Sequence, residues 1–372
     1  MAHRSYEGSS CFRQRLVLAT LSRTTVSISS IRLNDEDPGL SESEVNLLAL
    51  IDKISNGSCS EVDETGTRVT YTPGVLIGGK VDHDCGLDRS IGYFLEVLIA
   101  FAPFCKSPLE VTLKGVTNDP SDPSPDALKY TAIPVLKQFL KVHEANEVEL
   151  KVVARGLKPK GGGIVHFKCP IRRVLKPIQW MDAGKIKRIR GVAFASRVSP
   201  QTANRMVDAA KGILLSFLPD VFIHTEHMRG NKSGMSPGFG IILFAETTRG
   251  VFYVGESVSR SDTSDGQVSV PEDIARQAAH SLFEEIYRGG CADSTVQGLT
   301  FLFMALGEND LSKALVGPLS PHSIQLLRHM RDFLKVTFKL DPHKEDNSRT
   351  GSGKVMATCV GIGFSNLSKV VS

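Results

Sequence analysis

The sequence contains few cysteines and pairs none of them in a Cys-x-x-Cys motif. Its seven cysteines leave an odd count, which argues against a disulfide framework and favours a reducing compartment. Long apolar runs are also missing. The most apolar stretch, YFLEVLIAFAPF (93–104), is shorter than the ~18 residues that a membrane span needs and it carries Glu96. We therefore expect no membrane segment and no membrane partner.

Two common phosphate-binding motifs are absent as well. The chain has neither the GxxxxGK[ST] order of a P-loop nor the GxGxxG of a dinucleotide site. The stretch RGLKPKGGGIV (155–165) does place three glycines behind an arginine and two lysines. Adjacent glycines at the start of a strand often mark a bulge or a close approach of another backbone. Residue types alone therefore favour a structural role here over a phosphate cradle.

Composition is that of a folded protein. The 372 residues are 41% hydrophobic and 23% charged, with 44 Lys and Arg against 40 Asp and Glu. The formal charge of +4 permits a polyanionic partner without requiring one. The length predicts two domains, or one large domain of repeated units with an insertion.

An internal repeat organises the first half of the chain. Gly78 and His83 match Gly161 and His166 at one recurring offset. Each copy contains a helical pattern, SESEVNLLALIDKI in the first and SPDALKYTAIPVLKQF in the second, followed by two runs of alternating apolar residues. The predicted unit is strand, helix, strand, strand, and its repetition gives an α/β sandwich in which helices cover one face of mixed sheets.

The middle of the chain does not follow this repeated order of strands and helices. Residues 184–270 predict a strand, a helix and three further strands, closed by the Ser- and Asp-rich stretch SRSDTSDGQ. We therefore expect a small inserted α/β domain at 184–270, and a large repeat domain formed by 1–183 and 271–372.

The run RGLKPKGGGIV resembles the signature of the RNA 3'-terminal phosphate cyclase family. The resemblance covers nearly the full chain and continues through IRLNDEDPGL (31–40), GVTND (115–119), GIILFAETTRG (240–250) and GPLSPHSIQLL (317–327). It looks closest to the cyclase-like, ribosome-biogenesis branch, through the blocks GKIKRIRG (184–191), RVSPQTANRMVD (197–208) and EEIYRGGCADST (284–295). The resemblance implies the cyclase fold for the repeat domain and its insert.

An active cyclase of this family would use ATP and Mg²⁺. A histidine attacks the α-phosphate, AMP passes to an RNA 3'-phosphate, and the neighbouring 2'-hydroxyl closes a cyclic phosphate. The resemblance places His322 at the nucleophile position and retains Arg13 and Arg32. Such chemistry also needs a dense cationic pocket for the triphosphate.

The residues around that pocket depart from the family pattern. Asp35 stands where the family has an arginine, Ser43 and Glu44 replace a Gln-His pair, and Val296 replaces the acidic residue before Gln297. Exchanging a phosphate-binding arginine for aspartate turns an attraction of ~1.5 to 3 kcal/mol into a repulsion of similar size. We therefore expect a disabled ATP pocket, an idle His322 and no cofactor.

Basic residues cluster near the expected insert junction. KIKRIR (185–190) places cations on both faces of a predicted strand, and together with Arg155 and its following lysines it could follow a phosphate backbone. No metal site is expected, because His83 and its acidic neighbours have no second cluster to join. The phosphate- or RNA-binding candidates are Arg13, Arg32, Arg155, Lys158, Lys160, Lys185, Lys187 and Arg188.

The resemblance implies a non-catalytic, cyclase-like factor in pre-rRNA processing and 40S subunit biogenesis. It further implies docking to a ribosome-assembly GTPase and to the early pre-ribosomal particle, with a nuclear and nucleolar location. Two alternatives stay open: an active ATP-dependent cyclase that uses His322, and a pre-rRNA endonuclease that uses Arg328, His329 and Arg331.

Overall fold

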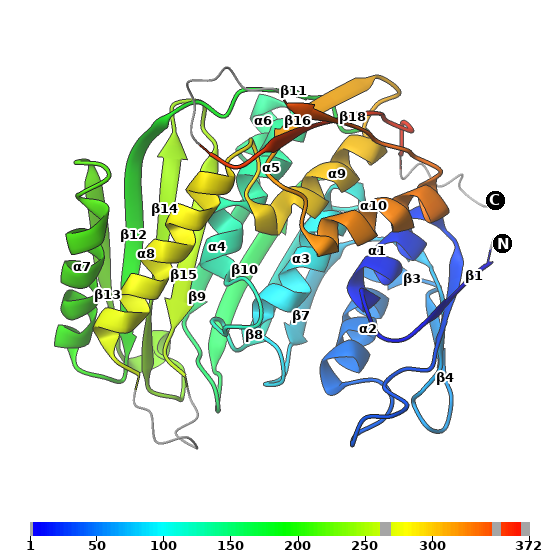
Figure 1. Cartoon of the computed structure of the whole chain (residues 1–372). Helices are drawn as coiled ribbons and strands as arrows, with labels where there is room; N and C mark the ends of the chain where they lie inside the picture. Colours follow the sequence, from blue (N-terminus) through cyan, green and yellow to red (C-terminus); the bar gives the residue numbers. More distant parts are fainter. Residues whose placement is uncertain (1–2, 261–268, 344–350, 366–372) are drawn as a thin grey trace.

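The computed structural model describes residues 3–260, 269–343 and 351–365, which form mixed α/β layers (Figure 1). Three four-stranded sheets share one strand order, in which the first strand is parallel to the second and the other pairs are antiparallel. The predicted α/β class and the repetition are confirmed. The repeated unit is longer than predicted, because each copy places one more strand and one more helix before the predicted strand, helix, strand, strand. No helix in the described ranges is long and apolar enough to cross a membrane.

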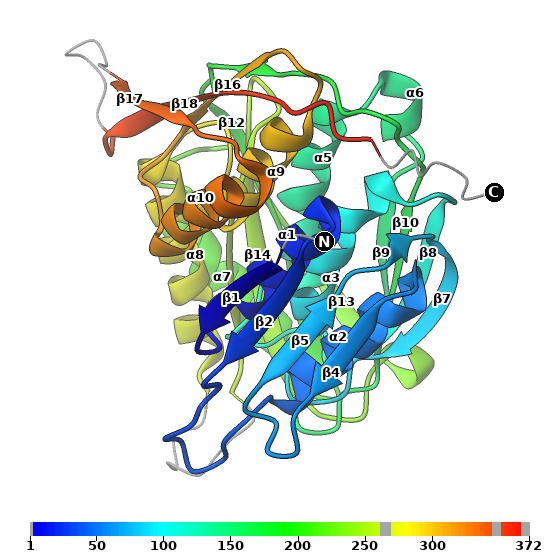
Figure 2. The same cartoon turned by 90° about the vertical axis from the view of Figure 1, so that its right-hand side faces the viewer.

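The first two copies of the unit lie where the sequence predicts them. The first copy comprises β1 (His3–Glu7), α1 (Phe12–Ser22), β2 (Thr25–Ser29), α2 (Glu42–Ile54), β4 (Cys59–Val62) and β5 (Val69–Thr72), with the small ribbon of β3 (Ser55–Asn56) and β6 (Val75–Leu76). The second comprises β7 (Gly79–Asp84), α3 (Ile91–Phe101), β8 (Leu109–Gly115), α4 (Pro125–Tyr130), α5 (Ala132–Phe139), α6 (Val142–Ala145), β9 (Glu149–Ala154) and β10 (Gly163–Cys169). Figure 2 shows the first sheet face on.

A third copy follows, which the sequence analysis does not identify. It comprises β11 (Gln179–Trp180), α9 (Gln297–Leu306), β16 (Leu311–Val316), α10 (Pro321–Leu334), β17 (Lys339–His343) and β18 (Lys354–Val360). The insert separates β11 from α9, so the copy is not continuous in sequence. Its helices join a shared core, because α9 and α10 contact each other and α10 contacts α1.

The insert is a four-stranded sheet with helices on one face. It comprises β12 (Ile186–Ser196), α7 (Pro200–Leu214), β13 (Val221–Met228), β14 (Gly238–Thr247), β15 (Phe252–Val258) and α8 (Pro271–Arg288), with strand order β13-β12-β14-β15. The expected boundary at residue 270 leaves α8 in the large domain, whereas the structure packs α8 on β14, β15 and α7. Ile274, Ala278 and Leu282 are buried in the insert core, so the insert extends through α8.

Helix α2 shows how the sequence positions part of the site. Ser41 caps it, since its hydroxyl accepts the Glu44 N–H while the Glu44 carboxylate accepts the Ser41 N–H at 2.9 Å. Leu47, Leu50 and Ile51 are fully buried on its inner face. Glu44 is therefore held at the first turn of α2, with one carboxylate oxygen committed to the cap.

The three glycines of the signature stretch form a backbone crossing. A Cβ on Gly163 would lie 2.8 Å from the Gly156 nitrogen, and one on Gly156 would lie 2.1 Å from the Gly163 nitrogen. Gly161 accepts a hydrogen bond from Met235, and a Cβ on Gly234 would lie 2.4 Å from the Gly161 oxygen. The glycines let the 229–236 loop of the insert pack against the large domain, which supports the structural role that the residue types favour.

Candidate functional site

A cleft of about 970 Å³ lies where the first copy meets α3 and α10. Residues from the start of α1, the loop after β2, the first turn of α2 and the start of α10 line it. The structure thereby brings together the positions singled out from the sequence: Arg13, Arg32, Asp35, Glu44 and His322.

A carboxylate pairs with each arginine of this cleft. Arg32 forms an ion pair with Glu44 and donates from Nε to the Gly39 carbonyl at 2.9 Å. Arg13 forms an ion pair with Glu96 and lies 4.3 Å over the Tyr93 ring. The phosphate ligands implied by the resemblance are thus already bound to protein groups.

The third arginine of the cleft, Arg89, follows the same pattern. It makes two bonds to Asp122, at 2.5 and 2.7 Å. Arg89, Glu96 and Asp122 are not among the site residues predicted from the sequence. A lone glutamate in the apolar run 93–104 is the signal that could have identified Glu96.

Further carboxylates, which form no ion pair with another described residue, add to the acidic character of the cleft. Asp35, Glu36, Asp37 and Asp88 line it in addition to Glu44. Fields of like sign add within a concave surface, so this lining disfavours a triphosphate. The substitution of an arginine by Asp35 therefore acts together with four other acidic residues.

His322 is the second residue of α10 and lines the cleft beside Arg13. Ser320 is the N-cap of the helix, and its hydroxyl accepts the Ser323 N–H at 3.1 Å. His322 is exposed, yet desolvation of its imidazole by neighbouring protein atoms lowers its pKa, with Glu96 opposing and Arg13 reinforcing this effect. The lowered pKa favours the neutral imidazole, which is the form that a nucleophile needs.

Gln297 supports the loop before His322. Its Nε2 donates to the Pro318 carbonyl at 3.2 Å, and its Oε1 accepts the Ser323 hydroxyl at 3.1 Å. These bonds occupy both ends of the amide, so Gln297 positions the start of α10.

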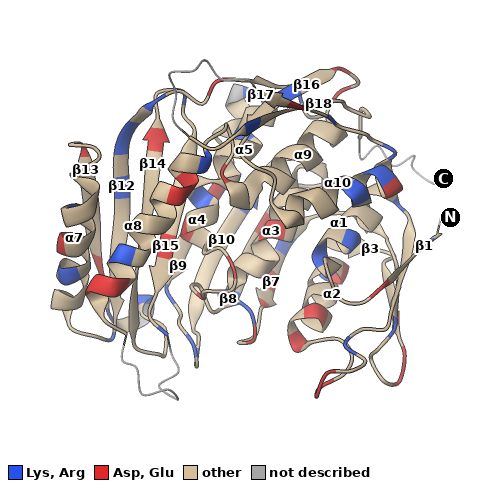
Figure 3. Cartoon of the chain, viewed as in Figure 1, with Lys and Arg blue, Asp and Glu red and all other residues tan. Residues whose placement is uncertain are grey.

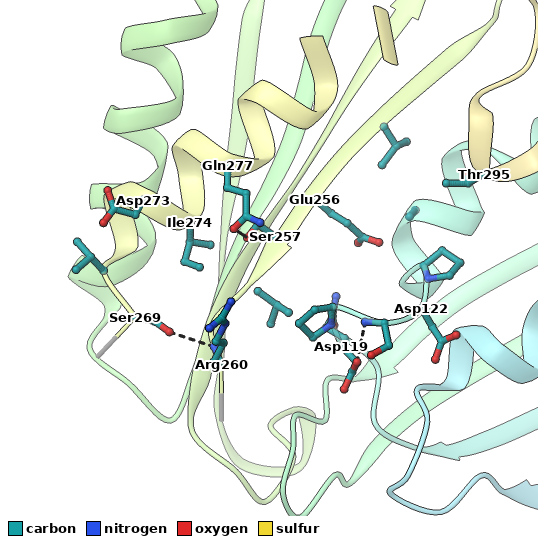
Figure 4. A pocket seen from close by; sticks show the side chains of 18 residues that line it. Asp119, Asp122, Glu256, Ser257, Arg260, Ser269, Asp273, Ile274, Gln277 and Thr295 are labelled. Carbon is teal, nitrogen blue, oxygen red and sulfur yellow. Dashed lines mark hydrogen bonds between the residues drawn. The ribbon is translucent and has the colours of Figure 1, made fainter. Parts of the chain in front are cut away.

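A second cleft, of about 630 Å³, lies between the second copy and the insert (Figure 4). A smaller hollow shares Arg13 and His322 with the first cleft and Thr295 with the second. In the second cleft, burial raises the pKa of Glu256 to about 7, and Glu256 accepts the Ser124 N–H at 2.9 Å.

Asp293 is a second carboxylate with a raised pKa near this cleft. Burial raises its pKa to about 6, and nearby Glu285 adds to the effect. Its oxygens accept the N–H groups of Val254 and Thr295 at 3.0 and 2.9 Å. The lining of the second cleft itself includes the carboxylates of Asp119, Asp122, Glu256 and Asp273 together with the guanidinium of Arg260.

Arg155 lies inside the protein. Its side chain is 2% exposed, donates to Asp126 at 2.6 Å and to Glu226 at 2.9 and 3.1 Å, and lies 4.5 Å over the Phe194 ring. It joins the large domain to the insert. The expectation that Arg155 faces a phosphate backbone is therefore corrected, because the buried guanidinium is fully committed.

The other basic candidates do not form one cluster. Lys158 pairs with Asp119 at 2.7 Å, and the Lys160 N–H donates to Ser236, beside the end of β12. Lys185, Lys187 and Arg188 lie at the opposite end of that strand, and Arg188 pairs with Glu246 at 2.6 Å. Arg188 and Ser196 are eight residue steps apart on this strand, which is roughly 27 Å, so the two groups of basic residues lie far from each other.

The endonuclease residues do not converge. His329 is 1% exposed and lies between Gln14 and Gln325, whereas Arg328 and Arg331 are exposed. Burial and the nearby Arg15 lower the pKa of His329 to about 4. Within the described residues no group of three or more His, Cys, Asp and Glu could hold a metal ion.

Comparison with known proteins identifies the class to which this fold and cleft belong. The family model for RNA 3'-terminal phosphate cyclase matches residues 4–340, and the chain belongs to that family. It is 54% identical over 367 residues to the human RNA 3'-terminal phosphate cyclase-like protein, covering 99% of this chain and 98% of that one. It is also 39% identical to a Schizosaccharomyces pombe protein named rRNA processing protein rcl1, over 98% of this chain and 97% of the relative.

Proposed function

We propose that this protein is a non-catalytic member of the cyclase family that acts in rRNA processing. One observation carries the proposal: each arginine that lines the cleft beside His322 is paired with a carboxylate. The pairs are Arg32 with Glu44, Arg13 with Glu96, and Arg89 with Asp122. A triphosphate would have to displace these carboxylates and approach Asp35. His322 is neutral and accessible, but it has no site that would hold its substrate.

The similarity to a relative named for rRNA processing supports the RNA pathway. We further propose that the protein acts in small (40S) subunit assembly in the nucleolus as a scaffold for a ribosome-assembly GTPase and pre-rRNA. A scaffold needs preserved surfaces and a stable fold but no cofactor, so neither ATP nor Mg²⁺ is required for this role.

Crosslinking in living cells tests this function. Tagged protein would be crosslinked to RNA by ultraviolet light and purified, the bound RNA sequenced and the attached proteins identified by mass spectrometry. We expect precursors of small-subunit rRNA and a GTPase, and the same partners for a His322→Ala variant. Absence of rRNA precursors from the bound RNA would contradict the proposal.

An active ATP-dependent cyclase is the second candidate, because His322 retains its position and a neutral ring. The two candidates differ in whether His322 accepts adenylate.

A further inference from the structure

The loop that joins β13 to β14 is fixed against the large domain by backbone hydrogen bonds. The Gly234 N–H donates to the Arg155 carbonyl at 2.5 Å, and the Met235 N–H donates to the Gly161 carbonyl at 3.0 Å. The Arg155 N–H in turn donates to the Lys232 carbonyl at 3.1 Å. The loop therefore presents its side chains from a fixed backbone, which lowers the entropy cost of binding.

Four exposed cations gather at this loop from three parts of the sequence. Arg229 precedes the turn Gly230–Lys232, and Lys232 is the last residue of that turn. Lys160 donates its N–H to Ser236 at 2.9 Å, and Arg197 donates from Nε to the Gly234 carbonyl at 2.6 Å. We call Lys160, Arg197, Arg229 and Lys232 the insert-loop surface. Figure 3 shows Lys and Arg at both ends of the insert sheet, and this surface is at the end where β12 terminates.

The charges of the insert-loop surface are not neutralised. Among the described residues, none of its four side chains forms an ion pair with a carboxylate. Lys158 and Arg155, which precede Lys160 in the sequence, bind the carboxylates of Asp119 and Glu226.

The opposite end of the insert sheet has a different charge balance. There Arg188 pairs with Glu246, Arg190 with Asp220, and Arg249 with Asp182. Lys185 and Lys187 are exposed, but they lie among these carboxylates. The two ends thus differ in how many of their cations are paired with carboxylates.

We propose that the insert-loop surface binds the phosphate backbone of RNA. Unpaired cations on a fixed surface favour a polyanion, since releasing its counterions drives binding. A protein interface would need an apolar centre, whereas the described loop exposes one large apolar side chain, that of Met235 at 60%. Because the partner is RNA, this inference rests on the proposed function and gives the RNA contact a location.

Fluorescence anisotropy with a labelled single-stranded RNA of random sequence tests the proposal. The full chain is compared with an Arg229→Glu/Lys232→Glu variant and with a matched Lys185→Glu/Lys187→Glu variant that carries the same change in net charge. Each measurement is repeated across salt concentrations, and a labelled polyglutamate peptide serves as a second probe. Circular dichroism and unfolding midpoints verify that both variants are folded.

We expect the loop variant to bind RNA at least tenfold more weakly and to lose about 1.4 from the log-log salt slope, at about 0.7 for each lost contact on a single strand. The matched variant should stay close to the unmodified protein. Equal losses in both variants, a loss only in the matched variant, or tighter binding of polyglutamate than of RNA would each overturn the proposal. Such a result, with crosslinking to rRNA precursors intact in cells, would leave the proposed function standing.

Discussion

Replacement of Arg155 by leucine separates a structural role from phosphate binding. The guanidinium makes three bonds to Asp126 and Glu226, and its removal leaves two carboxylates without a cation at the junction of insert and large domain. Breaking a buried pair in this way costs about 3–5 kcal/mol. The unfolding entropy of a 372-residue chain is about 0.8 kcal/mol/K, so a single cooperative transition should shift down by about 4–6 °C.

Differential scanning calorimetry at pH 7 measures this shift. A triple variant, Arg155→Leu with Asp126→Asn and Glu226→Gln, should recover part of the loss because no uncompensated charge remains. Lys160→Leu, which alters an exposed neighbour, should leave the midpoint nearly unchanged. If Arg155→Leu unfolded at the unmodified temperature yet bound RNA more weakly, the interpretation of Arg155 as a buried connector would be refuted.

Three further predictions concern the cleft, the glycine crossing and the second cleft. Calorimetry should show that ATP binds the unmodified protein no tighter than roughly millimolar. An Asp35→Arg/Glu44→Gln variant, which keeps a side chain that can cap α2, should bind ATP about 10²-fold more tightly or better. Equal ATP affinities of the two proteins would contradict the charge argument. Gly156→Ala should yield misfolded, poorly soluble protein, because the new Cβ would lie 2.1 Å from a backbone nitrogen. In α7, the Cβ of Gly212→Ala would meet nothing within 4 Å, so this control should stabilise the fold by roughly 0.5–1 kcal/mol, measured from the unfolding midpoint. Because burial raises the pKa of Glu256 from 4.5 to about 7, its contribution to the stability of the fold declines as pH rises through this range. Glu256→Gln should therefore raise the thermal unfolding midpoint at pH 8 but not at pH 4.5. An equal change of the unfolding midpoint at both pH values would contradict this prediction.

Local sequence patterns predict much of the fold. Alternating runs, the Ser41 cap and the apolar face of α2 specify the repeated unit, and the repeat reveals two of its copies. The third copy is not recognised in the sequence, because the insert separates its first strand, β11, from its first helix, α9. Helix α8 is assigned to the large domain instead of the insert, because an amphipathic pattern indicates that one face of a helix is buried but does not indicate which sheet covers that face.

The site is less predictable, because its electrostatics depend on partners distant in sequence. Arg13 pairs with Glu96, and Arg155 with Glu226, across segments that only the fold brings together. A basic residue in a sequence is a candidate for phosphate binding until its carboxylate partner is known. This is why Arg155 is misassigned, whereas the positions of Asp35 and Glu44 in the cleft follow from the resemblance.

Incubation of the purified protein with Mg²⁺ and ATP labelled at the α-phosphate tests the central claim most directly. An active RNA 3'-phosphate cyclase serves as the positive control, and the readout is acid-labile adenylate that remains on the denatured protein. We expect no adenylate on the unmodified protein, because the paired arginines and the acidic lining leave His322 without a substrate. Stoichiometric adenylate that disappears in a His322→Ala variant would contradict the account and identify the protein as an enzyme.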